Sequence, residues 1–302
     1  ILPFKQVAAE LPDIDFSACD KPLDAAIQWC DCRCREMFRL DQPMFDAAIL
    51  RLSESDSIFY LCLHHLIADA NAFRIAVQRL AAFYSGPLID DDCKPPQYSD
   101  YVTVGPLQNR ATVAEATTSR LPELYGQPNR ENGFHSSRID CDIDAELLDS
   151  FYDLANRGQA RSLSRDLAHF NLFATLLFDF LYRISGQRQL TIGAPFHNRS
   201  SSAYRETIGL FMELFPLRVE LEGNETFLTL LEKVKLESTR FLHRATREMP
   251  TTTSAFNAVF NFINIDFGNF AGIGMQTEWL HPGGCDKQHV LRMHLLQFAS
   301  GT

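Results

Sequence analysis

The sequence has little positive charge and no segment that would tie it to a nucleic acid or a membrane. It contains 28 lysines and arginines against 38 aspartates and glutamates, which gives a net charge of -10. Nucleic acids and anionic membrane surfaces favour clustered positive charge, so we expect neither as a partner. The longest apolar stretch, 170–184, is interrupted by Asn171, Asp179 and Arg183, and residues 1–4 lack the features of a signal peptide.

The sequence also lacks a metal-binding cysteine pattern. Its eight cysteines include no Cys-x-x-Cys pair, and no histidine stands beside the run of residues 30–34 that holds three of them. We therefore predict no metal site. Cys30 and Cys34 share one face of a predicted helix with Ile27 and Met37, as small core residues do, and a reduced, cytoplasmic setting is the simplest interpretation.

What the chain does have is the composition of a folded globular protein. Of its 302 residues, 46% are hydrophobic and 22% charged, enough for one large core or two moderate ones. Strand and helix patterns alternate in both halves, which predicts an α/β fold with two lobes of similar build and a cleft between them. We place an N-terminal lobe at 1–105, a connection at 106–135 within a proline-rich stretch, and a C-terminal lobe at 136–302.

Periodicity predicts the individual elements. Asn71, Asp144 and Thr226 are placed as helix caps. Helices are predicted over 20–40, 71–86, 145–158, 164–184 and from 227 onward, and strands over 47–52, 57–64, 138–143, 189–195, 217–221, 256–263 and 290–298.

The most informative stretch is 57–71, an apolar strand that ends in His64 and His65 and is followed by Asp69. Side chains alternate across a strand, so two consecutive histidines point to opposite sides. If His65 faces a cleft, His64 faces the protein body, and His65 is then the candidate base. Paired histidines beside a strand are also often hydrogen-bonded core groups, so the string alone leaves catalysis and structure as equal alternatives.

Four motifs in the same order resemble those of condensation domains of nonribosomal peptide synthetases, a branch of the HHxxxDG acyltransferase superfamily. Together they cover most of the chain from about residue 46. The matching stretches are HHLIADA at 64–70 (HHxxxDG), YSDY at 98–101 (YxDYA), GAPFHNR at 193–199 (GxPxxNR) and IGLFMELFPLR at 208–218 (IGxFVNTLPLR). Ala70 departs from the usual glycine, and residues 212–214 depart from the usual Val-Asn-Thr. The resemblance also implies that the family's first and last segments are missing.

The resemblance implies two chloramphenicol-acetyltransferase-like lobes in a V, with the active site at their interface and a tunnel open on both faces. It implies formation of an amide or ester from an acyl or peptidyl thioester. The substrates would be tethered to the phosphopantetheine of carrier proteins within neighbouring synthetase modules, with no cofactor bound to this chain. Tyr98 and Tyr101 are expected to be structural.

Chemistry suggests roles for the residues of the HHLIADA stretch. A neutral His65 can accept the proton of the nucleophile or stabilise the tetrahedral intermediate, with His64 beside it. Asp69 either orients His65 or locks the turn by pairing with an arginine, for which Arg199 is the candidate. The alternatives are that Arg199 is a plain surface cation or that the partner lies in the family's missing opening segment. The amides of Ala70 and Asn71 could stabilise the oxyanion.

Two other functions remain open at this point. The chain could be a free-standing acyltransferase that takes acyl-CoA or a carrier-bound donor and a soluble acceptor. It could also be a catalytically silent platform that keeps the fold for recruitment. An alanine at position 70 keeps the silent platform open, because a positive φ there would strain the turn that holds His65.

Overall fold

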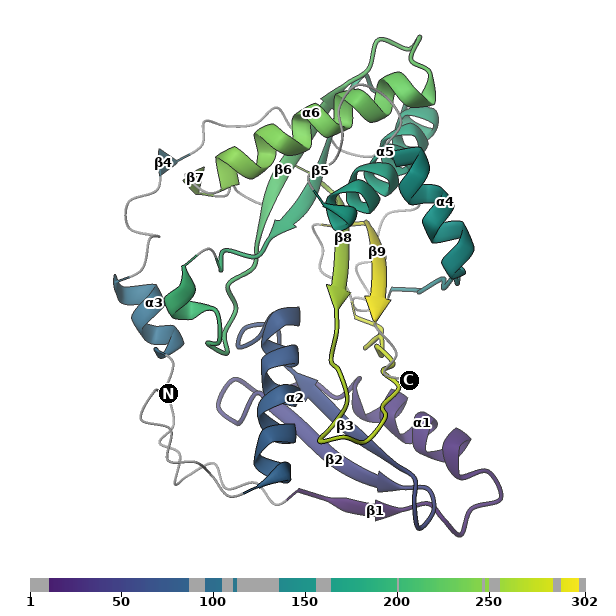
Figure 1. The fold of residues 1–302 in the computed structure, drawn as a ribbon, viewed down its shortest axis with the longest axis vertical. Helices are drawn as coiled ribbons and strands as arrows, with labels where there is room; N and C mark the ends of the chain where they lie inside the picture. The colour runs from purple at the N-terminus through teal and green to yellow at the C-terminus, as the bar shows by residue number, and fades with distance from the viewer. Residues whose placement is uncertain are drawn as a thin grey trace.

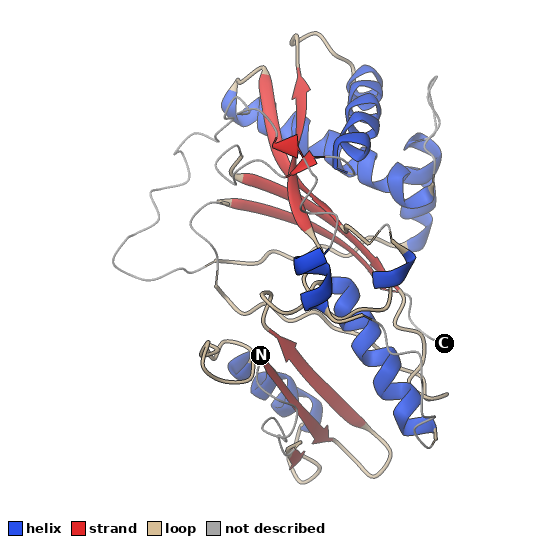
Figure 2. Ribbon diagram, turned by 90° about the vertical axis from the view of Figure 1, so that its left-hand side faces the viewer, coloured by secondary structure: helices blue, strands red, loops and turns tan. Residues whose placement is uncertain are grey.

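The computed structural model describes residues 11–86, 96–104, 111–112, 136–155, 164–199, 201–245, 248–249, 256–284 and 289–298. Within them the chain forms a mixed α/β fold with two main sheets, each packed against helices of its own (Figure 1). The two sheets also stay separate in the turned view of Figure 2.

The N-terminal sheet has three strands in the order β1-β2-β3. Strands β2 and β3 form the predicted hairpin across residues 53–56, and β1 joins β2 in parallel. The bounds are Asp13–Asp15 for β1, Phe45–Arg51 for β2 and Ser57–Leu63 for β3.

Helix α1, Pro22–Arg33, covers one face of this sheet. Ala26 and Cys30 pack against Leu50 and Tyr60, with Cys34 partly buried beside them. The helix is shorter than the predicted 20–40. The Cys34 amide still donates to the Cys30 carbonyl oxygen, but the amides of Arg35 and Glu36 donate to carbonyl oxygens three residues back, which ends the α-helical pattern. The prediction that Met37 lies on the buried face of this helix is therefore wrong: Met37 is 94% exposed.

The C-terminal sheet has four strands in the order β6-β5-β8-β9. Strand β5 pairs antiparallel with β6 and parallel with β8, and β8 pairs in parallel with β9. The bounds are Gln189–Phe196 for β5, Glu213–Glu220 for β6, Ala258–Ile265 for β8 and Leu291–Phe298 for β9; a separate two-stranded sheet joins β4, Ala111–Thr112, to β7, Glu248–Met249.

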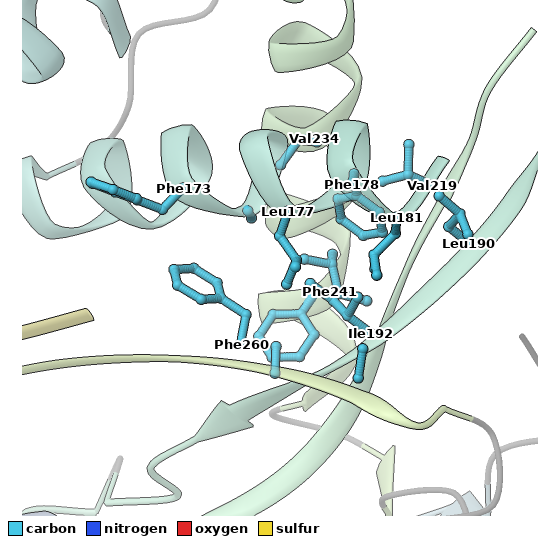
Figure 3. Packing of buried hydrophobic residues seen from close by; sticks show 14 of the residues in the cluster. Phe173, Leu177, Phe178, Leu181, Leu190, Ile192, Val219, Val234, Phe241 and Phe260 are labelled. Carbon is cyan, nitrogen blue, oxygen red and sulfur yellow. The ribbon is translucent and has the colours of Figure 1, made fainter. Parts of the chain in front are cut away.

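Helices α5 and α6 pack on this sheet and α4 packs against α5, and the largest core lies between the helices and the sheet (Figure 3). The core is built from the inward-facing residues of the strands and the apolar faces of the helices. The helices span Ala145–Ala155, Arg165–Ser185 and Phe227–Ala245; the labelled core side chains are Phe173, Leu177, Phe178, Leu181, Leu190, Ile192, Val219, Val234, Phe241 and Phe260.

Local capping explains why these helices begin where the sequence predicts. Asp144 accepts a hydrogen bond from the Leu147 amide at 2.7 Å, and Ser164 accepts one from the Leu167 amide at 3.1 Å. Each satisfies an amide that has no partner inside the helix. The strand predicted over 138–143 is wrong: these residues are irregular, and Arg138 instead donates to the Trp279 carbonyl oxygen at 2.5 Å.

Among the described helices, α5 is the one whose length and apolar composition would suit a membrane crossing. More than half of its most apolar window, 56%, is buried inside the protein. Ten of its residues lie in the interior, as is usual for the central helix of a core.

Two segments pack across the predicted boundary between the halves. One belongs by sequence to the predicted N-terminal lobe, 1–105, and packs against the C-terminal part, and the other does the reverse. Helix α3, Tyr98–Val104, lies against residues 204–211, next to the start of β6. Residues 266–284, which follow β8, contact the N-terminal part: Trp279 packs on Phe73 of helix α2, and Leu280 joins the core under α1. Helix α2, Ala70–Ser85, also packs against the end of β8.

Candidate active site

The two histidines lie just beyond β3, at the entry to a tight turn. The His64 amide donates to the Met44 carbonyl oxygen at 2.9 Å, and His64 Nδ1 accepts from the Leu66 amide at 3.1 Å. The half-buried His64 ring meets the edge of Phe38 with 5.8 Å between ring centroids. These contacts give His64 a structural part in shaping the turn.

His65 is exposed, and one of its ring nitrogens is held by the backbone. Its Nδ1 lies 2.9 Å from the Ala68 carbonyl oxygen. A carbonyl oxygen can only accept, so the proton of a neutral ring is on Nδ1 and the lone pair is on Nε2. The turn therefore presents a nitrogen that can take a proton.

Asp69 is at the centre of the contacts behind the turn, with 5% of its surface exposed. Its Oδ1 accepts from the Ala72 amide at 2.8 Å, and its Oδ2 accepts from the Phe211 amide at 3.0 Å. Arg199 Nη2 reaches the two oxygens at 3.0 and 3.3 Å. No contact that the structure describes joins Asp69 to His65. Asp69 therefore holds the turn in place through Arg199 and two backbone amides and is not the carboxylate of a catalytic triad.

Asp69 is also the cap of α2, which corrects the predicted cap at Asn71. The Asp69 backbone is extended, with φ -105° and ψ 177°, as is usual for a residue that precedes the first helical turn. Asn71 is already inside the helix, and its side-chain oxygen accepts from Arg74 Nε at 2.8 Å.

Arg199 is buried and ties the turn to the connection between β5 and β6. Besides Asp69, it donates to the carbonyl oxygens of Thr207 at 2.6 Å and Gly209 at 3.3 Å. Its guanidinium lies 4.1 Å from the ring centroid of Phe211, a favourable cation–π distance. Residues from the 64–70, 193–199 and 208–218 stretches thus meet at one point.

The alanine at position 70 does not strain this turn. Among the described non-glycine residues, positive φ angles occur at Asn198 and Ala271, and Ala70 is the first residue of α2. An alanine adopts that helical backbone conformation without strain. The amides of Ala70 and Asn71 belong to the first helical turn, whose N–H groups lack intrahelical acceptors and can bind an anion. Their role in stabilising an oxyanion stays a prediction.

Two features of the site were not predicted from the sequence, although the second lies within the stretch that resembles GxPxxNR. One is the backbone amide of Phe211, which binds Asp69 although the two residues are 142 positions apart. The other is Asn198, whose φ is 50° and whose side chain donates to the Phe211 carbonyl oxygen at 2.9 Å. The GAPFHNR and IGLFMELFPLR stretches marked the region, but side-chain type gives no signal for a backbone donor.

A cavity of about 410 Å³ lies elsewhere, between α1 and residues 136–140 and 278–283, and neither His65 nor Asp69 lines it. Within it Ser136 Oγ is 3.3 Å from His281 Nε2. However, His281 Nδ1 accepts from the Gly283 amide at 3.1 Å, so the proton of a neutral ring is on Nε2. His281 consequently donates to Ser136 and cannot activate it as a nucleophile.

No group of three or more potential metal ligands occurs among the residues that the structure places. The six cysteines among them are all free thiols.

Comparison with known proteins identifies the family. The sequence model described as "Condensation domain" matches residues 5–250. The chain belongs to the condensation-domain family. Among curated proteins, this condensation domain is 26% identical over 205 residues to Surfactin synthase subunit 1 of Bacillus subtilis, and 26% identical over 210 residues to Malpibaldin synthetase of Mortierella alpina. These matches each cover 64% of the chain but only 5% and 4% of the two relatives.

Solved structures show the same fold. The starter condensation domain of rhizomide synthetase, in complex with C8-CoA, matches with a TM-score of 0.61 at 19% identity, over 86% of this chain and 62% of that one. SgcC5 from Streptomyces globisporus matches with a TM-score of 0.65 at 19% identity, over 95% and 72%. This condensation domain thus spans about three fifths of the rhizomide structure.

Proposed function

We propose that this condensation domain forms an amide or ester bond between an acyl or peptidyl thioester and an amine or hydroxyl. Both substrates would arrive on the phosphopantetheine of carrier proteins, within a modular synthetase and its neighbouring modules. The curated relatives are synthases and synthetases, one of them named as a nonribosomal peptide synthetase, which supports this assignment. The active site would lie at the interface of two lobes arranged in a V.

The observation that supports the proposal most is the state of His65. Its ring is exposed, and the Ala68 carbonyl oxygen holds Nδ1 so that Nε2 of the neutral ring carries the lone pair. A base must be accessible to the proton that it removes and must present a lone pair to it, and the neutral His65 ring meets both conditions. General-base action of this kind contributes about 10²- to 10⁴-fold to a rate.

The surrounding residues would have supporting roles. Asp69 and Arg199 would hold the turn, His64 would shape it, and the amides of Ala70 and Asn71, in the first turn of α2, would stabilise an oxyanion. The thioester arrives already activated, so the reaction needs no nucleophilic side chain on this chain. Orientation of the two tethered substrates supplies the rest of the acceleration.

The test is a condensation assay with a carrier-loaded donor and a carrier-loaded acceptor, comparing wild type with His65→Ala. We expect a loss of about 10²-fold or more in product formation. His243→Ala is the matched control, because His243 is an exposed histidine on α6 that takes part in none of the contacts described at the turn. Equal rates for wild type and His65→Ala would exclude His65 as the base, and no product with any carrier would favour a recruitment platform.

One comparison favours a second candidate function, transfer from acyl-CoA. The rhizomide starter domain was solved with C8-CoA bound. The same assay with free acyl-CoA in place of the loaded donor carrier separates the two donors. Turnover with acyl-CoA that matches or exceeds turnover with the carrier would assign this second function.

A further inference from the structure

Three consecutive residues beside the turn are each held by a different side chain. Arg199 Nη2 donates to the carbonyl oxygen of Gly209 at 3.3 Å, and the Tyr98 hydroxyl donates to that of Leu210. The next amide, that of Phe211, donates to Asp69 Oδ2 at 3.0 Å. Two of these three side chains, Arg199 and Asp69, form the buried ion pair behind the turn. The third, Tyr98, comes from α3.

Helix α3 is docked on this segment by packing as well as by hydrogen bonds. The Tyr98 ring meets Phe211 edge-on with 5.1 Å between centroids, and the buried Tyr101 ring lies 4.5 Å from Phe211. At the start of the helix, Thr207 Oγ1 donates to the Pro96 carbonyl oxygen at 2.9 Å. These contacts give the helix a fixed position relative to residues 207–211.

Gly209 shows how closely Tyr98 approaches the backbone. A Cβ at position 209 would overlap Tyr98 Cδ2, at a separation shorter than any real contact of that kind. The ring therefore rests directly on the bare backbone of the segment. A side chain at 209 would displace either Tyr98 or the carbonyl oxygens that Tyr98 and Arg199 hold.

The Tyr98 hydroxyl is a permanent donor in this position. Burial, together with the nearby Asp69 and Glu213 carboxylates, raises the pKa of Tyr98. The hydroxyl consequently keeps its proton through the whole physiological range, and its hydrogen bond to Leu210 does not depend on pH there.

We propose that Tyr98 is a positioning residue for His65. The path has few steps: Tyr98 fixes Leu210, the adjoining Phe211 amide holds Asp69, and the peptide bond between Asp69 and Ala68 contains the carbonyl that holds His65 Nδ1. A shift of residues 209–211 would move Asp69 and, with it, the acceptor that sets the tautomer of His65. This role rests on the proposed function of His65 as the base.

The test compares Tyr98→Phe, which keeps the ring and removes the donor, with wild type. Loss of one net hydrogen bond predicts a kcat about three- to ten-fold lower, with the KM for the tethered donor unchanged. Long-range ¹H–¹⁵N spectra of the imidazole should show a smaller Nδ1–H tautomer fraction at His65. Tyr84→Phe is the matched control, because Tyr84 on α2 is 70% exposed, and it should change neither readout.

Thr207→Val is a second variant that weakens the docking of α3 without touching Tyr98 or residues 209–211. We expect a smaller change in the same direction in both kcat and the His65 tautomer. An unchanged tautomer and unchanged kcat in Tyr98→Phe would overturn the positioning role. A changed tautomer in a domain that forms no product would support the positioning role while the proposed function fails.

Discussion

The buried pair of Arg199 and Asp69 predicts a large loss of stability when the arginine is removed. The two side chains are 2% and 5% exposed. Arg199→Met keeps an unbranched side chain but removes the donors to Asp69, Thr207 and Gly209. Asp69 would remain buried with two backbone amides and no cation. Breaking a buried pair from one side costs about 3–5 kcal/mol, or roughly 6–10 °C in Tm for a chain of this size.

Urea unfolding measures this loss, and a double-mutant cycle with Asp69→Asn assigns it to the pair. Because the double variant leaves no unpaired charge, we expect it to be no less stable than Arg199→Met alone. Arg39→Met is the matched control: Arg39 pairs with Asp41, but their side chains are 69% and 66% exposed, and water screens such a surface pair, so its removal should leave the stability nearly unchanged. Losses that add within about 0.5 kcal/mol in the cycle would refute the reasoning.

Two further predictions concern pH and position 70. His169 is 1% exposed on α5, and burial lowers its pKa below the ordinary 6.5, so protonation favours the unfolded chain. Its contribution to stability is complete above pH 6.5 and decreases as the pH falls below it, by at most about 1.4 kcal/mol per pH unit. His169→Phe should therefore show a shallower acid slope of unfolding free energy, and equal slopes would contradict this. Ala70→Gly should change the rate of product formation less than about two-fold, because the alanine causes no strain that the glycine could relieve. The free energy of unfolding of this variant should fall by up to about 1 kcal/mol, since glycine is the poorer helix former. A large gain in rate would show that the alanine does distort the turn.

The sequence predicted the elements whose signals are local. Asp144 and Ser164 begin their helices as expected because a cap depends on residues two or three positions away. The hairpin of β2 and β3 followed from two apolar runs on either side of a short polar turn. The strand expected over 138–143 failed because alternation alone does not supply a partner strand, and Arg138 bonds to Trp279 instead.

The candidate site was predictable as a set of residues but not as an arrangement. Motif resemblance singled out His65, Asp69 and Arg199, and the structure brings the last two within 3.0 Å across 130 positions of sequence. The predicted cap of α2 at Asn71 is wrong, because the sequence pattern assigns Asp69 only a catalytic or an ion-pairing role. In the structure one carboxylate both caps the helix and pairs with Arg199. The Phe211 amide, which is the remaining donor to Asp69, is a backbone group, and the residue type at a position does not predict what its backbone amide will bind.

The two segments that pack against the opposite half, α3 and residues 266–284, limit how this protein can be divided. Each belongs by sequence to one half and packs against the other: Tyr101 of the first is 3% exposed, and the partly buried Trp279 and Leu280 of the second join N-terminal clusters. Neither half could be produced by itself without uncovering an aromatic surface. A molecule cut by a protease between the halves would therefore stay associated, because these segments and the Arg199–Asp69 pair still join its pieces.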